Sequence, residues 1–342
     1  MTQFILNRTT ALLMAVMFFG QHVAAPAAFL LTQNIWKAVA ASTLTPLPKD
    51  DSKSVGGFTI EEQEDRVLIS LHDKPVTQFV FRDKKILRPY FAGVHAPNGL
   101  QVTRNHPPIA GTDAADHDTM HPGLWLGFGD ISGNDYWRNT SRIEHLRFTE
   151  PPSVRGDRMT FSTESQFLMS GGQPLCRMVC QFTLVSRPSG WLLIWDSIFH
   201  ADNRDFAFGD QEEMGFGARV ATPLTEKNGG RLLNSNGLQT AATTWGQPAK
   251  WCDYAGTVGD RQGGITLMAA SANFRESWWH NRDYGVFVAN PFGRAAMKQG
   301  EASSVTVKQG KSFRIAFGAF VHDGITIDAA SEYTEFEELA KP

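Results

Sequence analysis

The sequence lacks the features that define several large classes of protein. It has no apolar run long enough to cross a bilayer, which takes about twenty residues, and no long run of Lys or Arg. Its 32 basic and 35 acidic residues nearly cancel, so no strong field attracts nucleic acid or an anionic membrane. It also has no phosphate-binding, dinucleotide-binding, nucleophile-elbow or zinc-protease motif. We therefore expect no nucleic-acid partner, no membrane span in the mature chain and no cofactor.

Cysteine is scarce, with 3 residues among 342. Cys176 and Cys180 lie four positions apart in a predicted strand, which is roughly 13 Å at about 3.3 Å per residue. Because the Cα atoms of a disulfide lie within about 7 Å, these two cannot pair. Cys252 can pair with either one, or all three can be buried thiols, which is the interpretation we favour. No C-x-x-C motif indicates a thiolate metal site.

The N-terminus has the pattern of a secretory signal peptide. Arg8 precedes an apolar segment at 11–20, and small residues at two candidate cleavage sites follow. We expect residues 1–28 to be the signal peptide, 29–56 a linker or disordered lead-in, and 57–342 a single β-sandwich domain. This organisation predicts a periplasmic or extracellular protein.

From Gly57 onward the sequence predicts many short strands separated by charged or glycine-containing turns. A single helix is predicted at 328–339, where Tyr333, Phe336 and Leu339 recur at three-residue spacing. Many strands, one terminal helix and no βαβ alternation predict an all-β fold, either a sandwich or a barrel. The predicted strands are 58–62, 66–71, 76–82, 159–168, 176–186, 191–201, 264–270, 285–289, 303–307 and 313–321.

One long segment, 94–122, interrupts this pattern. It is rich in Pro, Gly, Asp, Asn and His and shows little apolar periodicity. Loops of this length are uncommon in compact domains and are usually functional or disordered. Because firm strands flank it, we expect an ordered binding loop.

The end of that loop carries two histidines, His117 and His121, beside Asp116. Imidazoles with carboxylates serve as acid and base near neutral pH or bind a metal. Pro122 and Gly123 argue against a helix, so the spacing alone does not indicate a zinc site. Three interpretations stay open: catalysis or substrate contact, a metal site formed by Asp116, His117 and His121, and histidines that bond only backbone groups.

A second polar segment is 278–284, followed by Asn290. Here Trp279, His280, Arg282 and Asp283 place a flat ring beside directional donors and acceptors, which matches the mixed surface of a carbohydrate. Adjacent tryptophans in a strand face opposite sides, so at most one of Trp278 and Trp279 serves the core. The alternative is a structural Arg282–Asp283 ion pair beneath a packed tryptophan.

Two further segments are weaker candidates. Glu212 and Glu213 precede Arg219, and adjacent carboxylates on a strand face opposite sides, so one can enter a site while the other meets solvent. An acidic turn before an edge strand is the alternative. Asp130 and Trp137 lie close in sequence to the histidine loop, although singly they describe an ordinary surface turn.

Several segments together resemble the PmoA family of bacterial proteins, from about residue 57 to the end. The family name is borrowed from a methane oxygenase subunit. The resemblance implies an all-β fold, a large antiparallel β-sandwich like that of galactose mutarotase, and a link to sugar metabolism. Many relatives carry two consecutive histidines followed by Arg-Gly, whereas this chain has Met-His-Pro-Gly, so one imidazole and one cation are missing. The segments are 88–91, 95–99, 102–104, 116–125, 128–130 and 279–293.

We expect a carbohydrate-active enzyme that performs acid/base chemistry, as mutarotation, elimination or hydrolysis, on a sugar, glycoside or oligosaccharide ligand. Trp137 and Trp279 would stack on the sugar ring, and the arginines would neutralise developing negative charge. A non-catalytic sugar-binding or cell-surface scaffold protein and a metal-dependent hydrolase are the alternatives. The catalytic candidates are His117, His121, His280, Glu212 and Glu213. The substrate-binding candidates are His95, Arg104, Asp130, Trp137, Arg219, Trp279, Arg282, Asp283 and Asn290.

Overall fold

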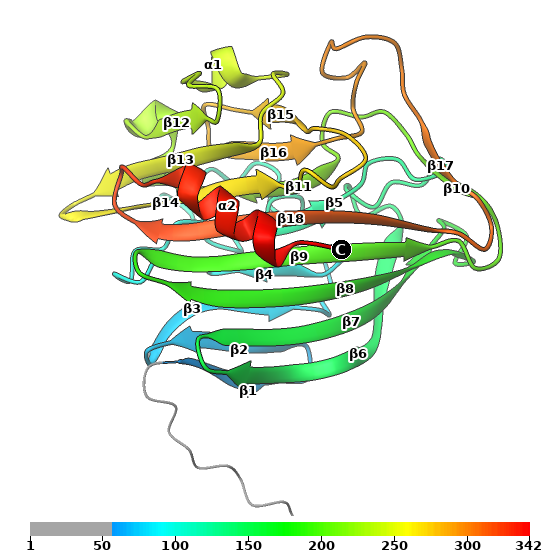
Figure 1. Cartoon of the computed structure of the whole chain (residues 1–342), viewed down its shortest axis with the longest axis horizontal. Coiled ribbons are helices and arrows are strands. Elements are labelled where there is room, and N and C mark those ends of the chain that lie inside the picture. The colour runs from blue at the N-terminus through cyan, green and yellow to red at the C-terminus, as the bar shows by residue number, and fades with distance from the viewer. Residues whose placement is uncertain (1–56) are drawn as a thin grey trace, which may run out of the picture. The chain divides into compact units, whose positions relative to one another are not determined.

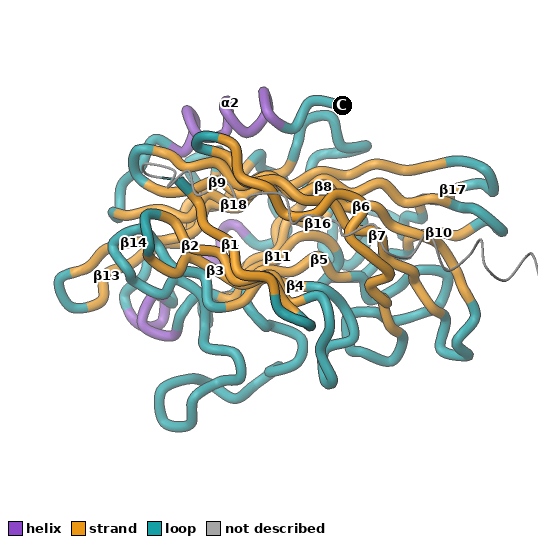
Figure 2. Tube along the Cα trace, turned by 90° about the horizontal axis from the view of Figure 1, so that it is seen from below, coloured by secondary structure: helices purple, strands orange, loops and turns teal. Residues whose placement is uncertain are grey.

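The computed structural model describes residues 57–342, and the predicted signal peptide and linker lie outside them. Two eight-stranded antiparallel sheets pack face to face around one large apolar core (Figures 1 and 2). The predicted all-β sandwich with a short C-terminal helix is therefore confirmed. Among residues 57–342, no helix has both the length and the apolar character needed to cross a membrane.

The first sheet carries the candidate site. It combines strands from the beginning, middle and end of the described chain, so residues far apart in sequence share one face. In order across the sheet, its strands are β1 (Phe58–Glu62), β2 (Arg66–Leu71), β3 (Lys74–Val80), β4 (Tyr90–Ala92), β5 (Leu124–Gly127), β11 (Gly215–Arg219), β16 (Val286–Asn290) and β15 (Trp278–Asn281).

The second sheet is built from longer strands and forms the other layer. In order, its strands are β12 (Arg231–Asn234), β13 (Trp251–Val258), β14 (Arg261–Ala269), β18 (Ser312–Asp323), β9 (Gly190–His200), β8 (Pro174–Arg187), β7 (Arg158–Leu168) and β6 (Arg142–Arg155). The remaining elements are the ribbon of β10 (Phe206–Phe208) and β17 (Val305–Val307), the 3-10 turns η1 (Thr222–Leu224) and η2 (Glu226–Asn228), and the helices α1 (Ala241–Thr244) and α2 (Ala329–Leu339).

Strand β9 shows why its sequence is apolar on both faces. Trp191, Leu193 and Trp195 point into the core between the sheets. Leu192 and Ile194 point the other way, into a second apolar cluster that helix α2 covers. In Figure 2 helix α2 lies on the outer side of the second sheet, and long loops lie on the outer side of the first.

Strand β11 lies between β5 and β16, inside the first sheet rather than at an edge. The strand registers place Tyr90, Trp125, Gly217, Val288 and His280 in one row across five strands. Tyr90, Trp125 and Val288 belong to an apolar cluster outside the main core, which shows that this row faces the loop-covered side.

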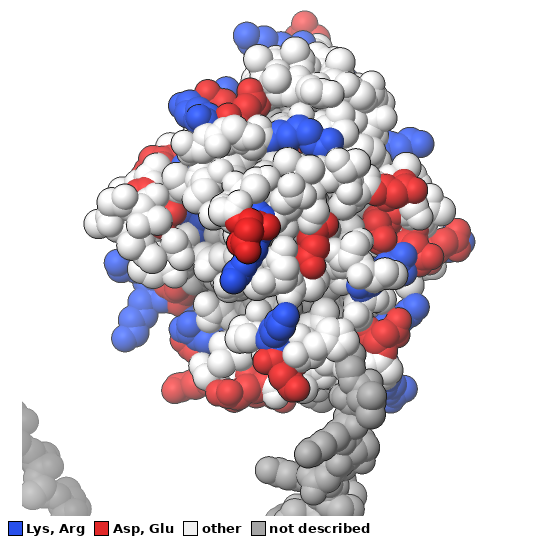
Figure 3. Space-filling model, turned by 90° about the vertical axis from the view of Figure 1, so that its left-hand side faces the viewer, with Lys and Arg blue, Asp and Glu red and all other residues white. Residues whose placement is uncertain are grey.

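The three cysteines are buried and unpaired, which confirms the interpretation as buried thiols. Charges of both signs are intermixed on the face shown in Figure 3. That view agrees with the nearly balanced composition and shows no large area of one sign.

Candidate functional site

Two glycines on the outer face of the first sheet make room for large aromatic rings. A Cβ atom at Gly217 would lie 2.8 Å from the ring of Trp125, and one at Gly127 would lie 2.6 Å from the ring of Trp137. Real Cβ contacts are not this short, so only glycine lets both indoles lie over the backbone. This aromatic layer supports the histidine loop above it.

The histidine loop is held in shape by Arg104, which is almost fully buried. Its Nη1 donates to the carbonyl oxygens of Ala114 and Asp116 at 2.8 and 2.7 Å, and its Nη2 donates to those of His117 and His121 at 3.3 and 3.4 Å. Arg104 was predicted to bind substrate, but its terminal nitrogens donate hydrogen bonds to the backbone of the loop.

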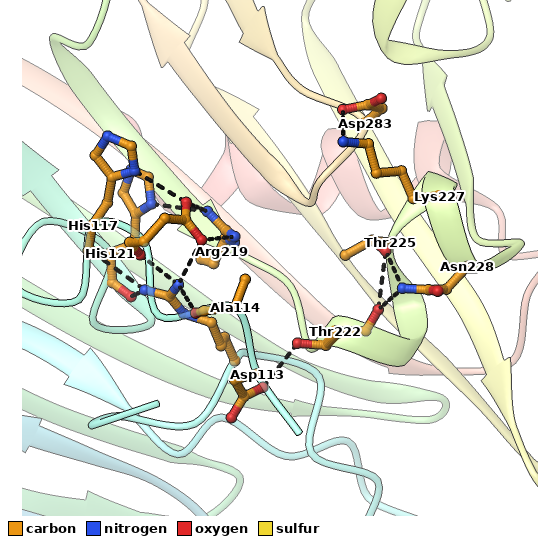
Figure 4. Close-up of polar contacts among 12 residues, drawn as sticks. Asp113, Ala114, His117, His121, Arg219, Thr222, Thr225, Lys227, Asn228 and Asp283 are labelled. Carbon is orange, nitrogen blue, oxygen red and sulfur yellow. Dashed lines mark hydrogen bonds and ion pairs between the residues drawn. The ribbon is translucent and has the colours of Figure 1, made fainter. Parts of the chain in front are cut away.

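Asp116 and Arg219 form a bidentate ion pair beside the histidines (Figure 4). Nη1 and Nη2 of Arg219 lie 3.1 and 3.0 Å from the two carboxylate oxygens of Asp116. Burial alone would raise the pKa of Asp116, but hydrogen bonds from Arg219 and His117 hold that pKa well below its usual value. Asp116 is therefore a permanent anion at neutral pH.

His121 is a neutral imidazole with a defined tautomer. Burial, followed by the positive charge of Arg219, holds its pKa well below 6.5. Nη1 of Arg219 lies 3.1 Å from Nδ1, and since guanidinium can only donate, Nδ1 accepts and Nε2 carries the hydrogen. Within residues 57–342 this buried Nε2 has no hydrogen-bond partner.

His117 is the accessible histidine of the loop, with a side chain that is 44% exposed. Its Nδ1 lies 3.0 Å from Oδ2 of Asp116. Its ring stacks on that of His121 at a centroid distance of 5.1 Å, and His121 stacks on Trp125 at the same distance. This arrangement fixes the ring and leaves Nε2 without a hydrogen bond to the described part of the chain, as a general base requires.

A second cluster surrounds His280, whose side chain is 1% exposed. Nδ1 lies 3.1 Å from Oε1 of Glu212, and Nε2 lies 3.9 Å from Oε1 of Glu213. Neither approach has hydrogen-bond geometry, so both nitrogens lack a hydrogen-bond partner among the described residues. Glu212 and Glu213 were expected to face opposite sides of a strand. They lie instead in the loop before β11, where strand alternation does not apply, and both approach one imidazole.

Glu212 is firmly held as an anion. Oε1 of Glu212 lies 2.6 Å from Nη2 of Arg282 and accepts a hydrogen bond from Nε1 of Trp245 at 3.2 Å. The His280 ring, followed by Arg282, lowers the pKa of Glu212. The pairing of Arg282 with Glu212 replaces the Arg282–Asp283 ion pair considered as an alternative.

Glu213 is the less constrained carboxylate of the second cluster. Its contacts to His280 and Arg138 are 3.9 and 3.7 Å long, which exceeds hydrogen-bond distance. Its side chain is 22% exposed. Glu212 is the more exposed of the two at 37%, but only Glu213 has a carboxylate that forms no hydrogen bond within residues 57–342.

Tyr284 connects the two clusters. Its ring lies 4.6 Å from the guanidinium carbon of Arg219. Burial raises the pKa of its phenol, and charges of both clusters, from Arg282, Arg219, Glu213 and Asp116, also act on it. The histidine loop (94–122) and the loop before β11 that carries Glu212 and Glu213, which we call the glutamate loop, therefore lie around the same part of the sheet.

The two indoles predicted to stack on a sugar are not accessible. Trp279 is fully buried in the core, and its Nε1 donates to the carbonyl of Ala249 at 2.9 Å. Trp137 lies on the correct face but is covered, with its ring 5.5 Å from that of His121. Half-buried Tyr284 and Trp245 offer accessible rings instead. Tyr284 stood beside the candidates Arg282 and Asp283, whereas no sequence signal marked Trp245.

The remaining substrate-binding candidates lie elsewhere or support the backbone. His95 lines a separate cavity of about 550 Å³ over β1–β3, and Asp130 accepts from the backbone of Gly133 in a turn at 2.8 Å. Asn290 is fully buried and donates to the carbonyls of the glutamate loop. Asp283 forms a surface ion pair with Lys227 at 3.5 Å (Figure 4).

The three potential metal ligands of the histidine loop do come together. One ligand atom each from Asp116, His117 and His121 lies within 4.8 Å of the others. Arg219, however, occupies both oxygens of Asp116 and Nδ1 of His121. A metal ion would have to displace this guanidinium, with Arg104 only 3.6 Å from the carboxylate.

Comparison with known proteins places the chain in a wider group. A family model described as "Family of unknown function (DUF6807)" matches residues 66–335. No curated protein matches the sequence.

Similar solved structures include a GH36 α-galactosidase from Geobacillus stearothermophilus, with 9% identity, a TM-score of 0.44, and coverage of 79% of this chain and 41% of that chain. A galactose mutarotase-like protein from Lactobacillus casei has 12% identity, a TM-score of 0.35, and coverage of 78% and 100%. Galactose 1-epimerase from Lactobacillus acidophilus has 7% identity, a TM-score of 0.39, and coverage of 78% and 98%. The chain thus spans about two fifths of the length of the α-galactosidase.

Proposed function

The chain belongs to the family of unknown function DUF6807, and for this member we propose an enzyme that transfers protons on a sugar or glycoside. One observation carries the proposal: two carboxylate–imidazole groups, contributed by separate loops and strands, lie around one aromatic sheet face. In the first group Asp116 holds His117. In the second, Glu213 lies beside His280.

The accessible member of each group is the catalytic candidate. His117 is oriented by Asp116 through Nδ1 and offers Nε2 as a base. Glu213 offers a carboxyl group that is not hydrogen-bonded within residues 57–342. His121 and His280 are buried, so in this conformation they act as positioning residues beneath the reacting groups.

An acid and a base suffice for mutarotation, and for elimination from a sugar in which a carbonyl or carboxyl group acidifies the C–H bond that the base breaks. In mutarotation, the base removes the proton of the anomeric hydroxyl while the acid protonates the ring oxygen, and the ring opens and recloses with both protons returned. Hydrolysis requires two carboxylates on either side of the bond. Glu212 is already bound by Arg282 and Trp245, which leaves the carboxylate of Glu213 and the imidazole of His117. Because only one carboxylate remains, mutarotation or elimination is favoured over hydrolysis.

The surroundings of these groups suit a saccharide. Tyr284 and Trp245 offer partly exposed rings for the C–H face of a sugar. We further propose export to the periplasm or cell exterior and kinship with the PmoA family, both of which derive from the sequence features described above.

The test is an NMR assay on D-glucose, D-galactose and their methyl glycosides. Exchange between the anomers of the free sugars reports mutarotation, and the appearance of free sugar from the methyl glycosides reports hydrolysis. We expect turnover by the wild type, and a loss of about 10²- to 10⁴-fold in His117→Ala and Glu213→Gln. Glu61→Gln, an exposed change on β1, is the matched control. Binding without turnover would instead support a sugar-binding protein, and neither binding nor turnover would refute the proposal.

A metal-dependent hydrolase is the second candidate, because Asp116, His117 and His121 cluster within 4.8 Å. If the protein is a metal-dependent hydrolase, the wild type should bind Zn²⁺ tightly. If the contacts of Arg219 with Asp116 and His121 instead block the site, the wild type should bind Zn²⁺ weakly, and Arg219→Met should bind it more tightly. Zn²⁺ titration by calorimetry separates the two outcomes.

A further inference from the structure

Four guanidiniums of the candidate site are paired with carboxylates within the protein, whereas Lys298, which lies 5.5 Å from the Trp245 ring, is in no ion pair of the described residues. Arg219 pairs with Asp116 at 3.0 Å, and Arg104 lies 3.6 Å from the same carboxylate. Arg282 pairs with Glu212 at 2.6 Å. These three cations therefore face two carboxylates, so the net charge of the site depends on its remaining charged residues.

Arg138 completes the set. It pairs with Asp135 at 2.9 Å and lies 3.7 Å from Glu213. Four guanidiniums (Arg104, Arg138, Arg219 and Arg282) thus meet four carboxylates (Asp116, Asp135, Glu212 and Glu213), and each guanidinium lies within 4.0 Å of at least one of these carboxylates. An anionic ligand would find no cation free of a carboxylate among these residues.

Two of the unused hydrogen-bond donors of the site belong to neutral groups, whereas Nε of Arg88 and Nε of Arg104 belong to buried guanidiniums whose terminal nitrogens already donate to the chain. His121 is an uncharged imidazole because its Nδ1 accepts from Arg219. Its Nε2–H and the Nε1–H of Trp137 are buried donors without partners in the described chain, and their rings lie 5.5 Å apart. A buried donor left unpaired costs about 1–3 kcal/mol, and a native structure retains such groups where a ligand or water completes them.

From this pairing we infer that the ligand is an uncharged saccharide, and that the site discriminates against uronic acids and sugar phosphates. This inference rests on the proposed sugar chemistry and specifies its substrate class. An anionic sugar would either break an internal ion pair or face an unpaired carboxylate, whereas the hydroxyl groups of a neutral sugar carry no charge that competes for the ion pairs. Discrimination of this kind arises from the repulsive element as much as from new contacts.

The experiment compares affinities for pairs of sugars in which one member carries an anionic group at C6. Titration calorimetry on the whole protein would measure D-galactose against D-galacturonate and D-glucose against D-glucose 6-phosphate, at low and at 0.5 M NaCl. We expect each anionic sugar to bind at least about tenfold more weakly than its neutral counterpart, a difference of about 1.4 kcal/mol. Tighter binding of the anionic sugars would overturn the inference and leave the proposed function standing. If no sugar binds, both fail.

Variants test whether the ion pairs set this preference. Asp116→Asn removes the carboxylate from Arg219, and we expect it to shift the galacturonate-to-galactose affinity ratio toward galacturonate by about tenfold, in a salt-sensitive manner. Glu212→Gln, which frees Arg282, provides a second variant should the first fail to fold. Asp205→Asn is the matched control, because it frees Lys308 of a remote pair between β10 and β17. An unchanged ratio in a folded Asp116→Asn or Glu212→Gln variant overturns the inference.

Discussion

The imidazole of His145, on β6, is enclosed by Phe81 and Phe148 at ring distances of 4.6 and 5.1 Å. Burial, followed by the charge of Arg82, lowers its pKa to about 4. The unfolded chain takes up this proton near pH 6.5, whereas the folded chain does so only near pH 4. The free energy of unfolding should therefore fall as the pH falls between these values.

His145→Phe should remove this contribution, because a phenyl ring fits between the two neighbours and cannot be protonated. We expect the variant to gain stability relative to the wild type at pH 5 and to lose that advantage at pH 8. Urea unfolding at both pH values measures the difference. His72→Gln, in the exposed turn between β2 and β3, should leave the pH dependence unchanged, and parallel curves for His145→Phe and the wild type would contradict the explanation.

At the residue scale the sequence located the polar groups better than the aromatic ones. His117 and His121 of the loop lie beside Asp116 and Arg219, the last residue of β11, and Glu213 lies beside His280 of β15. The predicted role of Trp279 depended on which alternate positions of β15 face the core. Alternation showed that Trp278 and Trp279 face opposite sides, but only the packed structure shows that Trp279 is in the core.

At the scale of elements, the sheet beneath the histidine loop depends on an absent side chain. A Cβ at Gly217 would lie 2.8 Å from Trp125, the ring on which His121 stacks. We expect Gly217→Ala to cost about 1–3 kcal/mol through overpacking and to weaken sugar binding by displacing that stack. In the background of Trp125→Phe, where the ring is smaller, the same change should cost less, so a double-mutant cycle by urea unfolding should give a coupling energy. Additive effects would show that the two positions do not interact.

The histidine loop should be ordered by Arg104 more than by its own contacts. Lysine can replace the charge of Arg104 but cannot reproduce four hydrogen bonds to separate carbonyls. We expect Arg104→Lys to speed hydrogen exchange of residues 114–121 while exchange in β7–β9 stays near the wild-type rate. Arg66→Lys, which alters a pair with the neighbouring Asp65, is the control. Unchanged exchange in 114–121 would show that the loop is held by other contacts.

Elements with clear alternation were predictable, and elements without it were not. The predicted bounds of 58–62 and 66–71 match β1 and β2. Strand β6 was missed, because it is an edge strand with a largely exposed sequence, two prolines and several register shifts. These features protect a sheet edge but remove the pattern by which a strand is recognised.

At the scale of the whole molecule, strand order decided where the site lies. Strand β11 pairs with β5 on one side and β16 on the other, which brings residues near 121, 219 and 284 together. Local patterns carry no information about such long-range partners. Sequence alone could therefore predict a sandwich or barrel and name candidate residues, but it could not show that β11 is an interior strand between β5 and β16, beneath those residues.

The burial of all three cysteines leads to a prediction for the molecule as a whole. Cys176, Cys180 and Cys252 are at most 2% exposed, and burial raises the pKa of Cys180 to about 11 and shifts those of the other two upward as well. Since the thiolate is the reactive form, the folded protein should keep its thiols even in an oxidising compartment. We expect no reaction of the native protein with a thiol reagent such as Ellman's, three equivalents after denaturation, and the same melting temperature with and without reductant. Fewer than three equivalents in denaturant would reveal a disulfide, and rapid reaction before unfolding would show that the sandwich opens to solvent far more often than this packing implies.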